Sequence, residues 1–114
     1  MNKEIVDDVT QAWNELNPEL IIKHLSEAFR YDSQWVFDHM LYEDYIDYIK
    51  GKFNTIRKGN SKIVAKTVPD PHMGGWMTQI IQYDGDIERP AYYRIKVEND
   101  KIIKGDLCMF KRYF

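Results

Sequence analysis

Residues 42–68 read YEDYIDYIKGKFNTIRKGNSKIVAKTV, and the spacing of their hydrophobic side chains changes partway along the stretch. In the first part these side chains lie at separations that place them on one helical stripe: Tyr42, Tyr45, Ile46, Ile49, Phe53 and Ile56. Such a stripe is typical of an amphipathic helix that buries one face. From Ser61 onward the period changes to two, which predicts a strand. The stretch therefore predicts a long helix that leads into a sheet.

The charges at the two ends of this helix support its predicted limits. Glu43 and Asp44 lie in its first turn, and Arg57 and Lys58 lie in its last turn. The helix dipole favours acidic side chains at the first end and basic side chains at the second. We expect Gly59 to end the helix in the left-handed conformation, which glycine tolerates.

Four strands are predicted after this helix: Lys62–Val68, Trp76–Tyr83, Ala91–Glu98 and Lys101–Lys111. The breaks between the last three are Asp84-Gly85-Asp86 and Asn99-Asp100. Short turns of this kind join neighbouring antiparallel strands. The second half of the chain therefore predicts an antiparallel meander.

The first 41 residues predict two further helices and a short strand. A first helix over residues 3–16 places Ile5, Val9, Trp13 and Leu16 on one stripe. Asn17-Pro18 then begins a second helix, capped by Asn17, that runs to about Ser26. Phe29–Asp32 alternates apolar and charged residues and predicts a strand, while Trp35–Met40 is either a second short strand or a packed loop. Helices first and strands later indicate one α+β domain over residues 1–114.

Composition excludes several classes of function. The formal net charge is −2, with 16 basic residues interleaved among 18 acidic ones, so we expect no nucleic-acid partner. A single cysteine, Cys108, rules out an internal disulfide and favours a reducing compartment. The chain has neither a signal-peptide pattern nor an apolar stretch of membrane-spanning length, so we expect a cytoplasmic protein with no membrane partner.

Two stretches resemble a known superfamily. Asn17–Ile21 leading into Ala28–Asp32, and the closing hairpin Lys96–Lys104, are similar to the nuclear transport factor 2-like superfamily, in its SnoaL-like and ketosteroid isomerase-like branch. The resemblance implies a cone-shaped, cystatin-like fold, with three N-terminal helices packed on a curved antiparallel sheet. It also implies a pocket between helices and sheet, and frequently a dimer through the outer sheet face. Because the superfamily contains enzymes, ligand carriers and protein-binding modules, it constrains function weakly.

The same resemblance suggests a general base. In isomerases of this branch a carboxylate follows the first strand, and Asp32 falls at that position, with His39 as a second candidate for proton transfer. Arg30 shares a strand face with Asp32, and a cation there would lower the carboxyl pKa and weaken the base. The family's oxyanion donors are a tyrosine on the first helix and an acid on the sheet. Here the first-helix position carries Trp13 and no sheet acid can be assigned, which disfavours a steroid-isomerase reaction.

Aromatic and sulfur-containing side chains are candidates for the lining of a pocket: Trp13, Trp35, Tyr45, Tyr93 and Met109. Ordinary core packing is the alternative interpretation for each of them. Two sets of alternating residues predict the concave wall of the sheet: Ala91, Tyr93, Ile95 and Val97, and Ile103, Gly105, Leu107 and Met109. The strand Trp76–Tyr83 is partly apolar on both faces, and a second copy covering the outer face would explain this, so we expect a homodimer.

Three hypotheses about function remain open at this level. The first is a domain that binds a small apolar or aromatic ligand, and the second is an isomerase or dehydratase using Asp32. The third is a protein-interaction module that uses the outer sheet face. Because the separations of His24, His39 and His72 match no ligand motif, we expect no metal, and no motif predicts a cofactor.

Overall fold

The computed structural model describes residues 3–33 and 36–108, with only the backbone of residues 36–38 described in the second range. The elements follow the chain in this order: α1 (Lys3–Glu15), α2 (Glu19–Ile22), β1 (Leu25–Ser33), β2 (Val36–Leu41), α3 (Tyr42–Lys58), β3 (Lys62–Pro69), β4 (Trp76–Asp84), β5 (Ile87–Glu98) and β6 (Lys101–Cys108). The predicted α+β class is confirmed, and the segment that sequence left open is the strand β2.

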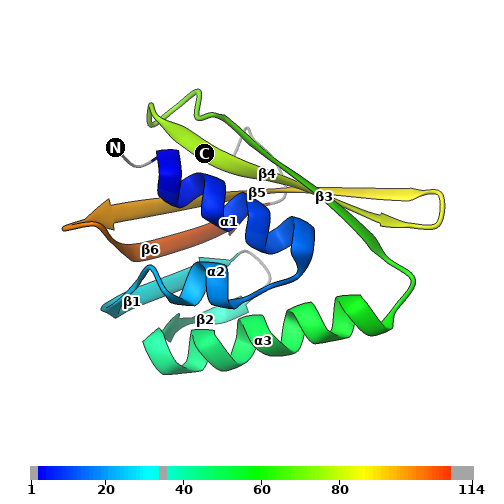
Figure 1. Ribbon diagram of the computed structural model, residues 1–114, viewed down its shortest axis with the longest axis horizontal. Coiled ribbons are helices and arrows are strands. Elements are labelled where there is room, and N and C mark those ends of the chain that lie inside the picture. The colour runs from blue at the N-terminus through cyan, green and yellow to red at the C-terminus, as the bar shows by residue number, and fades with distance from the viewer. Residues whose placement is uncertain (1–2, 34–35, 109–114) are drawn as a thin grey trace.

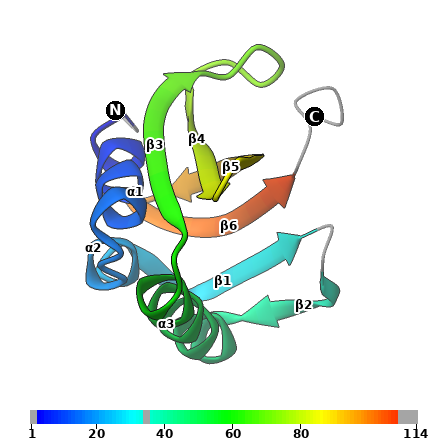
Figure 2. The ribbon, with the colours of Figure 1, turned by 90° about the vertical axis from the view of Figure 1, so that its right-hand side faces the viewer.

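All six strands join one sheet in the order β2-β1-β6-β5-β4-β3. Neighbouring strands are antiparallel except β1 and β6, which run parallel. The sheet is strongly curved, and the helices lie on its hollow side (Figures 1 and 2). The predicted meander is therefore β3–β6, and the N-terminal hairpin β1–β2 extends it.

The helices bury the stripes that their spacing predicts. In α3 the residues Tyr45, Ile49, Phe53 and Ile56 are buried, and in α1 the buried set includes Ile5, Val9, Ala12 and Trp13. Full burial of one such large apolar side chain stabilises the fold by about 1.5–3 kcal/mol. Polar contacts then fix α1 against the sheet. The Thr10 hydroxyl lies 2.8 Å from the hydroxyl of Thr67 and 3.0 Å from that of Thr78.

One predicted helix end is wrong, and so is the backbone conformation predicted at another. The second helix ends at Ile22, because the chain then turns into β1, and the carbonyl of His24 accepts the amide of Ile102 at 2.8 Å. The Asn17 side-chain oxygen accepts the amide of Glu19 at 3.2 Å, as expected of a cap, although Pro18 holds the N-cap position and the helix begins at Glu19. Gly59 has a φ of −86° and is extended, not left-handed. Its amide still closes α3 by donating to the carbonyls of Thr55 and Ile56.

The predicted concave wall is confirmed for β5 and needs one correction for β6. Tyr93, Gly105 and Leu107 are buried as expected. Ile103 is only half-buried, whereas Ile102 is fully buried. The register between the two strands shifts at Lys96/Val97, so that Val97 faces Ile102. A bulge of this kind reverses which residues point inward and cannot be deduced from alternation.

No helix within residues 3–33 and 36–108 is both long and apolar enough to cross a membrane.

Candidate functional site

A cavity of about 250 Å³ lies between the helices and the hollow face of the sheet. Its walls come from α1, α3 and the three strands β4–β6. The described lining residues are Trp13, Lys52, Ile80, Gln82, Arg89, Pro90, Ala91 and Leu107.

Strand register arranges the sheet residues of this lining in layers. Tyr93 pairs with Leu107 at the inner end, where both side chains are buried. Ile80 pairs with Ala91 in the next layer. Gln82 then pairs with Arg89 beside the β4–β5 turn, where Arg89 is exposed. The cavity therefore changes from apolar at its inner end to polar and positively charged at its mouth.

Trp13 closes the cavity on the α1 side. Its ring is packed edge-on against Phe53 of α3, with centroids 4.8 Å apart and planes at 74°. The side chain is only 3% exposed, yet its indole N–H has no hydrogen-bond partner among the residues that the structure describes. Nearly all buried polar groups in native proteins are paired, and an unpaired one costs about 1–3 kcal/mol. The lining of the cavity thus includes a residue with a buried donor that lacks an acceptor.

The polar groups at the mouth come from two sides. Lys52 of α3 lies 5.7 Å from the centre of the Tyr48 ring, and its Nζ is 3.4 Å from the Tyr48 hydroxyl. Arg89 of β5 donates its Nε–H to Asp84 at 2.8 Å. Asp84 also accepts from the Ser61 hydroxyl, and the bonds from Ser61 and Arg89 hold its carboxyl pKa below the ordinary value.

Tyr45 and Tyr93, which the sequence analysis proposed as pocket residues, lie together in the buried core. The hydroxyls of Tyr45 and Tyr93 are 2.9 Å apart, and both side chains are at most 1% exposed. Burial raises the pKa of both phenols above the ordinary value, so both keep their protons at neutral pH. Neither residue lines the described wall of the cavity. The assignment of both to a ligand stays a prediction.

Asp32 lies on the opposite side of the sheet. Phe29 and Tyr31 point into the core, and the alternation of β1 turns Arg30 and Asp32 outward. The Asp32 carboxylate is 3.4 Å from Nε of Arg30 and 3.9 Å from Nζ of Lys104. The pairing with Arg30 that the shared face predicts is therefore present. Catalysis by Asp32 stays a prediction, and the outward, ion-paired position gives it no support.

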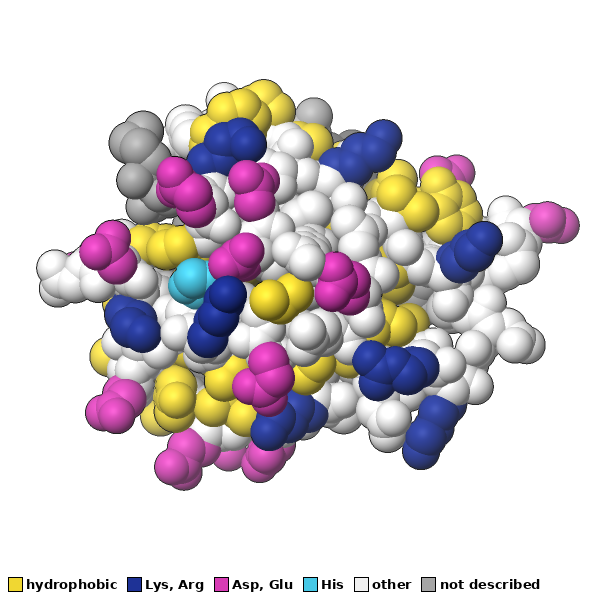
Figure 3. Space-filling view, in the orientation of Figure 1, with side chains coloured by type: hydrophobic (Ala, Val, Ile, Leu, Met, Phe, Trp, Pro, Cys, Tyr) yellow, Lys and Arg dark blue, Asp and Glu magenta, His cyan; other side chains and the backbone are white. Residues whose placement is uncertain are grey.

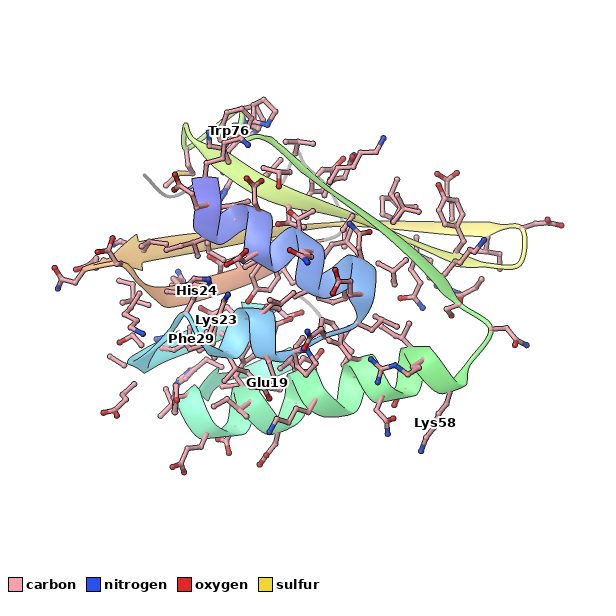
Figure 4. All side chains as sticks on the ribbon, viewed as in Figure 1. Glu19, Lys23, His24, Phe29, Lys58 and Trp76 are labelled. Atoms are coloured by element: carbon pink, nitrogen blue, oxygen red, sulfur yellow. The ribbon has the colours of Figure 1, made fainter. Side chains whose placement is uncertain are left out.

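The other predicted site residues are dispersed. His39 is exposed on β2, and Trp35 and Met109 lie outside the described residues. His24 and Lys23 lie beside α1 (Figure 4), where His24 Nε2 is 2.7 Å and Lys23 Nζ 3.3 Å from the Asp8 carboxylate. Within the ranges that the structure describes, no group of three or more histidine, cysteine or acidic side chains is arranged to hold a metal. Burial raises the pKa of the Cys108 thiol.

Sequence reasoning found Trp13 but missed the residues at the mouth. Lys52 lies one residue before Phe53, on the flank of the apolar stripe, and Arg89 lies in the stretch we left between two strands. The β4–β5 hairpin is longer than predicted, because β5 begins at Ile87 and not at Ala91. Its cross-strand register is what places Arg89 beside Gln82 at the mouth.

Neither a protein-family model nor a curated protein matches the chain. Solved structures do match over nearly its whole length. A nuclear transport factor 2-like protein of unknown function from Cytophaga hutchinsonii is 16% identical, with a TM-score of 0.65 over 99% of this chain and 93% of that one. The chain has the nuclear transport factor 2-like fold. The fold predicted from the sequence resemblance is thereby confirmed.

Two other solved structures that match the chain are described as different kinds of protein. A protein with a ketosteroid isomerase-like fold from Catenulispora acidiphila, in complex with trimethylamine, is 14% identical, with a TM-score of 0.61 over 91% of this chain and 83% of that one. An LEH-like epoxide hydrolase from M. tuberculosis is 10% identical, with a TM-score of 0.61 over 95% of this chain and 84% of that one. At these identities the likeness shows the fold alone, and function must come from the site.

Proposed function

We propose that the protein binds a small apolar molecule, about the size of one ring with a short substituent, in the cavity between α1, α3 and β4–β6. The volume of about 250 Å³ supports this size. An apolar cavity of about 150 Å³ holds benzene, whereas pockets for drug-sized ligands span roughly 300–1,000 Å³. A steroid is too large for this space.

The observation that carries the proposal is the unpaired indole N–H of Trp13. A ligand oxygen is an acceptor that the described part of the chain does not supply to this donor. The N–H is buried from solvent, so binding includes a small shift of the packing between Trp13 and Phe53. The apolar side chains of Ile80, Ala91 and Leu107 then contact the body of the ligand.

The lining favours binding over proton transfer. Among the lining residues that the structure describes, Lys52 is the one side chain of a type that commonly transfers protons, and it lies at the mouth against Tyr48. General acid–base catalysis needs such a group within hydrogen-bond reach of the reacting atom. The carboxylate that sequence favoured, Asp32, lies on the outer face, so the proposal gives it no role.

Titration with benzyl alcohol, followed by the indole N–H resonances in proton–nitrogen NMR spectra, tests the proposal. The Trp13 resonance, assigned from a Trp13→Phe variant, is expected to shift, while that of the half-exposed Trp76 stays in place. An Ala91→Phe variant fills the cavity from its wall and is expected to abolish the shift without unfolding the protein. A Trp13 resonance that does not move up to millimolar probe, or an unchanged response in folded Ala91→Phe, contradicts the proposal.

A further inference from the structure

We infer that the ligand of this cavity is a small carboxylic acid, whose apolar end lies inside and whose carboxylate is bound at the mouth by Lys52 and Arg89. The inference rests on the proposed function and specifies the class of ligand. It depends on a separate observation, which is the distribution of charge around the opening.

Lys52 is the first of the two cations. It extends from α3, and its contacts are the ring and the hydroxyl of Tyr48. No ion pair of Lys52 is found within the described parts of the chain. Asp47 lines the shallow groove that adjoins the cavity beside Lys52, but it forms no ion pair with it. An ammonium group held at a pocket opening is a ready partner for an anion.

Arg89 is the second cation and faces the opening from the sheet. A guanidinium has five N–H donors, and the bond from Nε to Asp84 uses one of them. Asp84 is also held by Ser61 and Gln82, so it has a structural role at the turn and does not line the cavity. Counting Lys52 and Arg89 against Asp84 and the Asp47 of the adjoining groove, the charges around the opening balance, but among the described lining residues of the cavity itself only the two cations are charged.

The contrast with the rest of the surface strengthens the inference. Acidic and basic side chains alternate over the face that contains α1 and α3 (Figure 3). Around the cavity the described lining has two cations and no carboxylate. Carboxylates accept short, charge-assisted hydrogen bonds from lysine and arginine, whereas an amine is repelled. A cationic ligand such as the trimethylamine in the Catenulispora acidiphila protein does not suit this mouth.

The test compares benzoate with benzyl alcohol and benzylamine by isothermal titration calorimetry. All three share one ring, and they carry a negative, a neutral and a positive group. We expect benzoate to bind about tenfold more tightly than benzyl alcohol, and benzylamine not to bind. Added salt should weaken only benzoate, because exposed charges are screened.

Variants separate the roles of individual charges. Lys52→Gln and Arg89→Gln are each expected to weaken benzoate about tenfold and to weaken benzyl alcohol much less, because benzyl alcohol carries no charge. Lys58→Gln is the matched control, because Lys58 is exposed at the far end of α3 and points away from the body of the protein (Figure 4). It should not change either affinity.

The outcomes distinguish the two proposals. Equal affinities for benzoate and benzyl alcohol, both insensitive to Lys52→Gln, overturn the carboxylate inference and leave the binding function intact. Tighter binding of benzylamine overturns the inference in the same way. No binding of any of the three probes overturns the inference together with the proposed function.

Discussion

Gly105 shows how closely the core beside the cavity is packed. It lies on β6, where the backbone passes the Tyr93 ring, and it is buried. A Cβ atom at this position would lie 2.6 Å from the Tyr93 hydroxyl oxygen and 3.3 Å from Cζ of Phe29. Since the Tyr93 hydroxyl is paired with that of Tyr45, the ring cannot move away without breaking a buried hydrogen bond. Only glycine fits this position.

Gly105→Ala is therefore expected to destabilise the protein by about 1–3 kcal/mol, the usual cost of overpacking a filled core. The measurement is the free energy of unfolding in urea. Gly51→Ala is the control, because Gly51 is exposed within α3 and an added Cβ there meets nothing within 4 Å. The control should be stabilised by about 0.5–1 kcal/mol, since alanine favours helix over glycine. Equal effects of both substitutions would contradict this account of Gly105.

Contacts between residues close together in the chain could be predicted from the sequence. Contacts between distant residues that depend on strand register could not. The pairing of Arg30 with Asp32 follows from strand alternation and is present at 3.4 Å. Lys52 and Arg89 are separated by 37 positions, and no local pattern relates them. They share the cavity because α3 and the β4–β5 hairpin both border it, and the register of the hairpin places Arg89 beside Gln82.

Among the elements, the connection between β3 and β4 is held by one buried ion pair. Asp70 accepts hydrogen bonds from Nε and Nη2 of Arg94 at 2.5 and 2.8 Å, and from the amides of His72 and Met73. Its side chain is 2% exposed. Burial opposes ionisation of Asp70, but the bonds from Arg94 and the two amides outweigh it, so the carboxyl pKa is lowered. The pair fixes this connection to β5.

Asp70→Asn is expected to lower the free energy of unfolding at pH 7 by about 3 kcal/mol, because it leaves Arg94 without its buried anion. The folded pKa of Asp70 is below the unfolded value, so its contribution is present above about pH 4 and is lost as the pH falls through the folded pKa. The difference between wild type and variant should therefore shrink in urea titrations below pH 4. Asp86→Asn, in an exposed turn, is the control and should change nothing. A difference that stays constant down to pH 2 would argue against an ionised Asp70.

Element boundaries were predictable wherever local periodicity decides them. Helix α3 begins at Tyr42 and ends at Lys58 as its stripe and its end charges indicate. The segment around His24 was not predictable, because Leu25 begins a strand that pairs with Ile102 far along the chain. Local spacing of Leu20, Ile21 and Leu25 favoured a longer helix, but pairing with β6 decided the structure.

For the whole molecule, the outer face of the sheet supports the homodimer that we expect from the sequence. Val64 of β3 pairs with Ile81 of β4, and alternation turns both away from the helices. Val64 is 39% exposed, and Ile81 and Tyr92 are half-buried. The curved sheet leaves this face without a helix among the described elements (Figure 2). Covering an apolar face with a second copy removes it from water.

Sedimentation at tens of micromolar should give a species of about twice 13.7 kDa for the wild type. Ile81→Lys places a charge at the middle of the proposed interface, where desolvation without a partner is costly, and should give the 13.7 kDa monomer. Ile87→Lys is the matched control, because Ile87 is 55% exposed at the tip of the β4–β5 hairpin, and it should leave the dimer intact. The cavity opens on the other side of the sheet, so the Ile81→Lys monomer should still bind benzyl alcohol. A wild type that sediments at 13.7 kDa would remove the dimer while leaving the binding proposal untouched, because the described lining of the cavity is supplied by one chain.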